Sequence, residues 1–298
     1  MMTTLSVALP PPPGMSEAPV WTGAEFRLGG DSRRVLAFDL GQSGWSEELF
    51  TLHQEQVGGD HFMDVASRRH ALEALDRFLP GQGGVILEVG CSGGYFLGDL
   101  VAARPEAEII GADYTLGALE HLGRRLSGIP LLQFDLTRCP LPDASVDAVV
   151  LLNVLEHIER DDVAVAQLRR ILRPGGVMIA EVPAGPSLYD AYDKHLMHFR
   201  RYGMPGFRAL VEGGGFEILE QSHLGFFLYP PFWLTKKLNR LRPPATDAKA
   251  EQLVEASMSA TRRTGGVGHA IMTTEAWLRR AAYLPFGIRC LVTARRPA

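Results

Sequence analysis

The feature that most constrains this chain is the stretch VILEVGCSGG, residues 85–94. Val85, Ile86 and Leu87 form a short apolar run bounded by glycines, which is typical of a fully buried strand in a parallel sheet. The residues after Gly94, YFLGDLVAAR, carry apolar side chains at helical spacing. The stretch therefore predicts a strand, a glycine turn and a helix, an arrangement that brings bare backbone and a helix N-terminus against a ligand.

The residues of the turn argue against two common ligands. A dinucleotide fingerprint needs glycine at the first, third and sixth positions, but Gly90 is followed by Ser92 and Tyr95. A phosphate-binding P-loop would end in Gly-Lys-Ser/Thr, and this turn contains no lysine. Glu88 at the end of the strand suits a ligand with a cationic amino group, and it would repel a pyrophosphate.

Further strands with polar residues at their ends follow the turn. EIIGAD, residues 108–113, ends in Asp113 at the distance where doubly wound folds place the carboxylate that binds ribose hydroxyls. LLQFDL, residues 131–136, brings Asp135 to the same edge, and the strand 146–152 is followed by Asn153. A helix over 161–173 and the strand 177–183 complete the pattern.

Residues 85–183 together resemble the class I S-adenosylmethionine-dependent methyltransferases, in particular the small-molecule enzymes of types 11 and 12 that include ubiquinone-biosynthesis methyltransferases. The turn resembles their first motif, (D/E)-x-G-x-G-x-G, with Ser92 in place of the middle glycine. The resemblance implies a Rossmann-like, doubly wound α/β fold. It predicts a seven-stranded, mostly parallel sheet with an N-terminal lid and a C-terminal insertion.

The same resemblance implies S-adenosyl-L-methionine as cofactor and S-adenosylhomocysteine as product. The cofactor-binding residues that it implies are Glu88, Gly90, Cys91, Gly94, Asp113, Tyr114, Asp135, Leu136, Asn153, His157 and Arg68. Two of these stay open between roles: Arg68 suits either a cofactor contact or a solvated helix face, and His157 either a direct contact or a packing role.

The family places its acceptor-binding groups after the fifth strand, here residues 183–205. This segment is rich in polar and aromatic side chains, which favours a site. His195 or His198 is the natural general base, because imidazole titrates near neutral pH, and Asp193 would orient it. Capping roles for the histidines and catalysis by positioning alone remain open. No metal site is predicted, since these three residues lack a further ligand.

Composition limits the partners. The chain has 298 residues, 46% hydrophobic and 21% charged, with a net charge of −4. This balance argues against a nucleic-acid partner.

Three scattered cysteines predict a cytoplasmic location, and no stretch is long enough to span a membrane. Aromatic and basic residues over 223–244 suit a core-covering insertion, a dimer contact or a pocket lid better than a membrane surface, which is not favoured. The chain is expected to act as a monomer or homodimer.

The predicted organisation has five parts: a disordered proline-rich tail (1–20), an N-terminal lid (21–80), a cofactor-binding core (81–222), an insertion covering the acceptor (223–286) and a closing strand (287–298). The predicted function is methyl transfer to a small-molecule acceptor, such as a hydroxylated aromatic or a secondary metabolite. The alternatives are methylation of a lipid-linked acceptor at a membrane surface and a catalytically silent, cofactor-binding regulatory protein.

Overall fold

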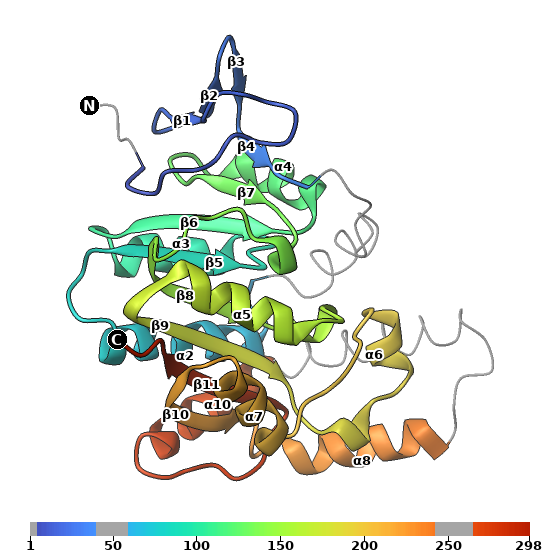
Figure 1. Cartoon of the computed structure of the whole chain (residues 1–298). Helices are drawn as coiled ribbons and strands as arrows, with labels where there is room; N and C mark the ends of the chain where they lie inside the picture. The colour runs from blue at the N-terminus through green and yellow to red at the C-terminus, as the bar shows by residue number, and fades with distance from the viewer. Residues whose placement is uncertain (1–4, 40–58, 242–264) are drawn as a thin grey trace.

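The computed structural model describes residues 5–39, 59–241 and 265–298. Its centre is an eight-stranded sheet with the order β10-β11-β9-β8-β5-β6-β7-β4, and helices cover both faces (Figure 1). The strands from β4 to β9 are parallel, whereas β11 pairs antiparallel with both β9 and β10. The predicted doubly wound α/β fold is confirmed.

The strands of this sheet are β4 (Val35–Ala37), β5 (Val85–Val89), β6 (Glu108–Asp113), β7 (Leu131–Gln133), β8 (Val146–Leu152), β9 (Leu172–Pro183), β10 (Glu217–Leu224) and β11 (Arg289–Arg295). Strand β5 is buried along its whole length. Leu87 and Val89 join the hydrophobic core on one face of the sheet, and Ile86 joins the core on the other. This two-sided burial is why the strand reads as a continuous apolar run.

The helices form two layers. Helices α2 (Phe62–Phe78), α3 (Tyr95–Ala103), α4 (Leu116–Arg125) and α10 (Gly265–Arg279) lie on one side, and α5 (Asp161–Ile171) and α7 (Met204–Gly213) lie on the other. Helices α6 (Ala191–His195) and α8 (Tyr229–Leu241) lie beyond the end of β9 (Figure 1). Short 3₁₀ helices follow three strands: η1 (Leu136–Arg138), η2 (Leu155–His157) and η3 (Pro186–Leu188).

The N-terminal region differs from the expectation. The sheet has eight strands rather than seven, because β4 pairs parallel with β7 instead of belonging to a separate lid. The expected disordered tail is packed from residue 5 onward: Val7 and Leu9 are buried in the main core, since their side chains find apolar partners on the sheet. Strands β1 (Val20–Trp21), β2 (Phe26–Leu28) and β3 (Asp31–Arg33) form a small second sheet.

The C-terminal region also differs in detail. Pro230 and Pro231 begin helix α8 rather than interrupting a segment, because proline is tolerated in the first turn of a helix. The sequence pattern of residues 273–286 predicts a helix, and the structure has one earlier in the chain, as α10. The sequence also predicts helices over 44–56 and 251–263 and a linker over 243–250, and these three ranges lie outside the described residues. Among the described helices, none is long and apolar enough to cross a membrane.

Candidate functional site

The glycine turn between β5 and α3 has a backbone that other residues would not adopt easily. Gly90 and Gly94 have φ values of 78° and 73°. A Cβ on Gly90 would lie 2.4 Å from Cγ2 of Val154, and one on Gly94 would lie 2.3 Å from Cδ1 of Leu122. Gly94 caps helix α3 without a side-chain hydrogen bond. The first backbone N–H groups of α3 therefore receive no hydrogen bond acceptor from the side chain of the N-cap residue. Such N–H groups can donate to a polar or anionic ligand.

Two carboxylates border this turn. Asp113 ends β6 and accepts hydrogen bonds from the backbone N–H groups of Ser92 and Thr115, both at 2.9 Å. Burial raises the pKa of Asp113, while these two hydrogen bonds lower it. Glu88 is 4% exposed, and its Oε2 has no hydrogen-bond partner among the described residues. Burial, with Asp113 nearby, raises the pKa of Glu88 well above its usual value.

These residues fit S-adenosylmethionine. A carboxylate can accept about four hydrogen bonds, so Asp113 retains capacity for the ribose hydroxyls after its two backbone contacts. The buried Oε2 of Glu88 lacks a donor in the described structure, and the cofactor's ammonium group is a donor of the right charge. At Gly90 the space that a side chain would need is already filled by Val154.

Arg68 and Asp135, which are also predicted to bind the cofactor, both have polar partners within the protein. Arg68 lies beside the turn, bonded to Asp99 at 2.7 Å and to the carbonyl of Gly59, with its guanidinium 5.8 Å from the centre of the Tyr95 ring. Asp135 caps η1 by accepting from Thr137 with its Oδ1, and its Oδ2 contacts Arg138 at 3.4 Å.

Four residues predicted to bind the cofactor are buried in the cores or have polar groups engaged elsewhere. Asn153 donates its side-chain amide to Glu181 at 2.8 Å. Leu136 and Cys91 are buried in the two cores, and burial raises the pKa of the Cys91 thiol well above its usual value. The backbone carbonyl of Tyr114 accepts a hydrogen bond from Gln133. Cofactor contacts by these side chains remain predictions.

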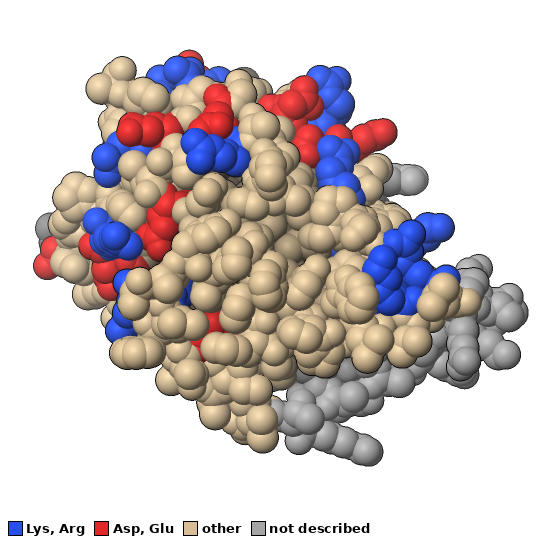
Figure 2. Space-filling view, turned by 90° about the horizontal axis from the view of Figure 1, so that it is seen from below, with Lys and Arg blue, Asp and Glu red and all other residues tan. Residues whose placement is uncertain are grey.

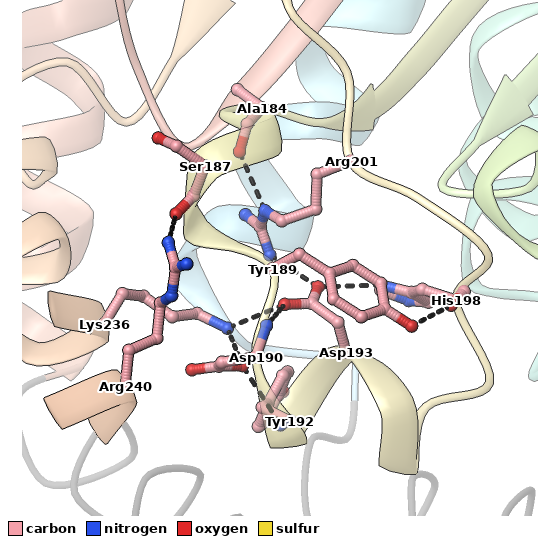
Figure 3. A network of polar contacts seen from close by, with 10 residues as sticks. All are labelled: Ala184, Ser187, Tyr189, Asp190, Tyr192, Asp193, His198, Arg201, Lys236 and Arg240. Carbon is pink, nitrogen blue, oxygen red and sulfur yellow. Dashed lines mark hydrogen bonds and ion pairs between the residues drawn. The ribbon is translucent and has the colours of Figure 1, made fainter. Parts of the chain in front are cut away.

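Asp193 is the centre of a buried ion network in the segment after β9 (Figure 3). Its side chain is fully buried, and its Oδ1 contacts Arg201 at 2.7 Å and Nδ1 of His198 at 3.0 Å. Its Oδ2 contacts Lys236 of helix α8 at 3.1 Å, and Lys236 also contacts Asp190 at 2.7 Å. Burial favours the neutral acid, but His198 and the two cations hold the pKa of Asp193 below its usual value.

The two candidate bases have different surroundings. Nδ1 of His198 is engaged by Asp193, as the sequence predicted for an oriented histidine. His195 ends helix α6, and its buried Nε2 has no hydrogen-bond partner among the residues that the structure describes. The structure thus brings Asp193 and His198 together, but it does not place His195 in the ion network that surrounds them.

His157 lies against His198 rather than alone at a strand end. Their rings meet edge to face with centroids 4.7 Å apart. Glu156, the residue before His157 in η2, is fully buried, and neither of its carboxylate oxygens has a hydrogen-bond partner in the described part of the chain. Burial, with Glu181 nearby, raises the pKa of Glu156 to about 8. Glu156, His157 and His198 form one cluster.

A second buried charge cluster was not predicted as a unit. Arg289 of β11 contacts Glu181 of β9 at 2.8 Å and Asp64 of α2 at 2.6 Å. Glu181 is 1% exposed. No local pattern could reveal this cluster, because its members lie far apart in the sequence. Glu156 did carry a signal, its position next to a histidine at a strand end.

Comparisons with known proteins agree with this geometry. Residues 87–180 match the family model described as "Methyltransferase domain". A Mycolicibacterium smegmatis protein named "Probable S-adenosylmethionine-dependent methyltransferase" is 34% identical over 144 residues, which cover 48% of this chain and 54% of that protein. A demethylmenaquinone methyltransferase of Deinococcus radiodurans is 31% identical over 150 residues, covering 47% and 61%. The match thus spans less than two thirds of either relative.

A solved structure supports the fold. Phosphoethanolamine N-methyltransferase 2 of Haemonchus contortus, in complex with S-adenosyl-L-methionine, has a TM-score of 0.57 over 86% of this chain and 59% of that chain. Its sequence identity is 14%, so the likeness concerns the fold alone.

Proposed function

We propose that this chain, which resembles the S-adenosylmethionine-dependent methyltransferases and matches their domain over residues 87–180, transfers the cofactor's methyl group to a small-molecule acceptor. When bound, the cofactor would supply an electrophilic methyl group on its sulfonium sulfur, with S-adenosylhomocysteine as the leaving group. The observation that carries the proposal is the cradle made by the glycine turn, Glu88 and Asp113.

The acceptor is proposed to lie against residues 183–205. Ligands of doubly wound sheets bind beyond the carboxyl ends of the strands, and this segment leaves the end of β9. It is held in place by a bridge between Ala184 and Tyr202 and by the buried ion network at Asp193 (Figure 3). A segment fixed in this way can hold an acceptor at attack distance and exclude water, which supplies much of the rate of a displacement.

His195 is the proposed proton acceptor for a hydroxyl or amine substrate. Its Nε2 has no hydrogen-bond partner among the described residues, whereas His198 already bonds Asp193. A positioned base contributes about 10²–10⁴-fold to such a reaction. The roles of Asp193 and His198 in this scheme are to position the segment.

An assay with radiolabelled S-adenosylmethionine and a panel of hydroxylated aromatics and amines tests the proposal. The wild-type protein should label at least one acceptor class, and His195→Ala should lower kcat by about 100-fold or more with its affinity for S-adenosylhomocysteine unchanged. His121→Ala, an exposed histidine on α4, is the control and should keep full activity. A protein that binds the cofactor but labels nothing would favour a silent, regulatory homologue.

A lipid-linked acceptor is the second candidate, and one surface feature favours it. Helix α8 exposes Trp233, Leu234, Leu238 and Leu241, with 78% of Leu241 accessible. Figure 2 shows a largely uncharged central area, with mixed charges along its top and left and a group of Lys and Arg at its right. Exposed aromatic and aliphatic side chains beside basic residues are typical of helices that lie on anionic membranes.

Vesicle sedimentation distinguishes the two acceptor classes. Binding to anionic vesicles that falls several-fold in the double variant Trp233→Ala/Leu234→Ala, with cofactor affinity unchanged, would favour the lipid-linked acceptor. An absence of binding to vesicles would argue against the lipid-linked acceptor and favour a small soluble acceptor.

A further inference from the structure

The cluster of Glu156, His157 and His198 combines three side chains of the types that bind metals. One donor atom from each residue lies within 4.8 Å of the donor atoms of the other two. Glu156 and His157 come from η2, directly after β8, and His198 comes from the segment after α6. A backbone hydrogen bond from the Phe199 N–H to the Glu156 carbonyl, 2.8 Å long, ties the two segments together beside the cluster.

Glu156 is the feature of this cluster that requires an explanation. It is fully buried, and both of its carboxylate oxygens lack a hydrogen-bond partner among the described residues. A buried carboxylate without partners is costly, so such groups are normally paired with a cation or bind a metal. Glu181, a buried acid whose charge acts on Glu156, has its own partners in Arg289 and Asn153 and adds negative charge to this region.

His198 is oriented as metal-binding histidines usually are. Its Nδ1 bonds the Asp193 carboxylate at 3.0 Å, and Asp193 is itself fixed by Arg201 and Lys236. The hydroxyl of Tyr189 donates to the His198 carbonyl at 2.7 Å, which also fixes the backbone at this residue. A carboxylate on one ring nitrogen sets the tautomer and directs the other nitrogen toward a metal.

The donor set indicates which ion would bind. Two imidazoles and one carboxylate suit zinc and similar divalent transition metals, whereas magnesium and calcium prefer sites made only of oxygen. Donor atoms around a tetrahedral zinc lie about 3.3 Å apart, given zinc–nitrogen distances of about 2.0–2.1 Å. Small rotations of the three side chains would therefore bring their donor atoms to the shorter separations that a bound ion requires.

We propose that Glu156, His157 and His198 bind one divalent transition-metal ion of the zinc type. The site adjoins the cofactor cradle, since Val154, two residues before Glu156, packs against Gly90. Three protein ligands leave a coordination position open. If the proposed methyl transfer is correct, an acceptor oxygen can take that position; binding of the ion itself does not depend on that function.

The test is calorimetric titration of zinc chloride into the full chain after removal of metals with a chelator, in the absence of cofactor and acceptor. The wild-type protein should bind one ion per chain, and Glu156→Gln and His198→Ala should bind it at least about tenfold more weakly. The matched controls are His121→Ala and Glu159→Gln, which change exposed residues of the same types. No zinc binding, or equal binding by Glu156→Gln and the controls, would overturn the proposal.

A stability measurement separates loss of the ion from loss of the fold. The amide in Glu156→Gln keeps the shape of the buried carboxyl group and cannot ionise, so the metal-free variant should melt at or above the Tm of the metal-free wild type. Zinc should then raise the Tm of the wild type and of both controls but not of Glu156→Gln. A zinc-dependent rise of equal size in Glu156→Gln would mean that the ion binds elsewhere.

Discussion

The turn at Gly90 has no space for the methyl group of an alanine side chain. The residue has a φ of 78°, and an added Cβ would lie 2.4 Å from Val154. Gly90→Ala therefore combines backbone strain with a steric clash. We expect a loss of about 1–3 kcal/mol in the free energy of unfolding, measured by urea titration, and a weaker affinity for S-adenosylhomocysteine.

Gly98 provides the matched control. It is exposed within helix α3, and a Cβ there meets nothing within 4 Å. Gly98→Ala should raise the free energy of unfolding by about 0.5–1 kcal/mol, because alanine favours the helix. Equal stability of the two variants would contradict the strained-turn account.

Asp193 offers a second prediction at the scale of one residue. Its fully buried carboxylate neutralises Arg201 and Lys236, which are themselves almost inaccessible. Asp193→Asn leaves these cations without their shared anion, so we expect a loss of about 3–5 kcal/mol in the free energy of unfolding. Denaturant titration beside Asp143→Asn, an exposed acid, gives the comparison; a loss as small as that of the control would mean that the network contributes little.

The packing of α2 against α10 predicts how stability depends on pH. His70 of α2 is 4% exposed and contacts Arg279 of α10, and burial together with this cation lowers its pKa to about 3. Its folded pKa lies below the usual value of 6.5, so the unfolded chain takes up the proton first. The stability that neutral His70 contributes is therefore fully present above pH 6.5, and it is lost as the pH falls toward 3.

At pH 5 this linkage should cost about 2 kcal/mol relative to neutral pH. His70→Gln has no proton to gain, so its unfolding free energy should fall less between pH 7 and pH 5 than that of the wild type. Urea titrations at the two pH values measure the difference. Parallel pH dependence in the two proteins would show that His70 does not stay neutral in the fold.

The elements also show what the sequence could and could not predict. Strand β5 and the turn after it were predictable, because glycines bound the strand and its apolar run is local. The pairing of β4 with β7 was not, since the parallel register is set by residues almost a hundred positions apart. The partners of Asp193 differ in the same way. His198 is five residues away and was predictable as a partner, whereas Lys236 comes from a distant helix and was not.

For the molecule as a whole, the N-terminal segment is part of the main core. Leu9 is 5% exposed and packs in the same cluster as β5 and α5. Leu9→Ala should therefore lower the free energy of unfolding by about 2–4 kcal/mol. Leu234→Ala on the exposed face of α8 is the control and should change it by about 0.5 kcal/mol or less. A similar, small effect at both positions would mean that the segment is dispensable.

The measurement that tests the account most directly is calorimetric titration of S-adenosylhomocysteine into the wild-type chain, Asp113→Ala and the exposed control Asp143→Ala. We predict micromolar binding by the wild type and the control, and at least about tenfold weaker binding by Asp113→Ala, a difference of about 1.4 kcal/mol. Binding that is absent from the wild type, or unchanged in Asp113→Ala, would contradict the assignment of the cradle to this cofactor.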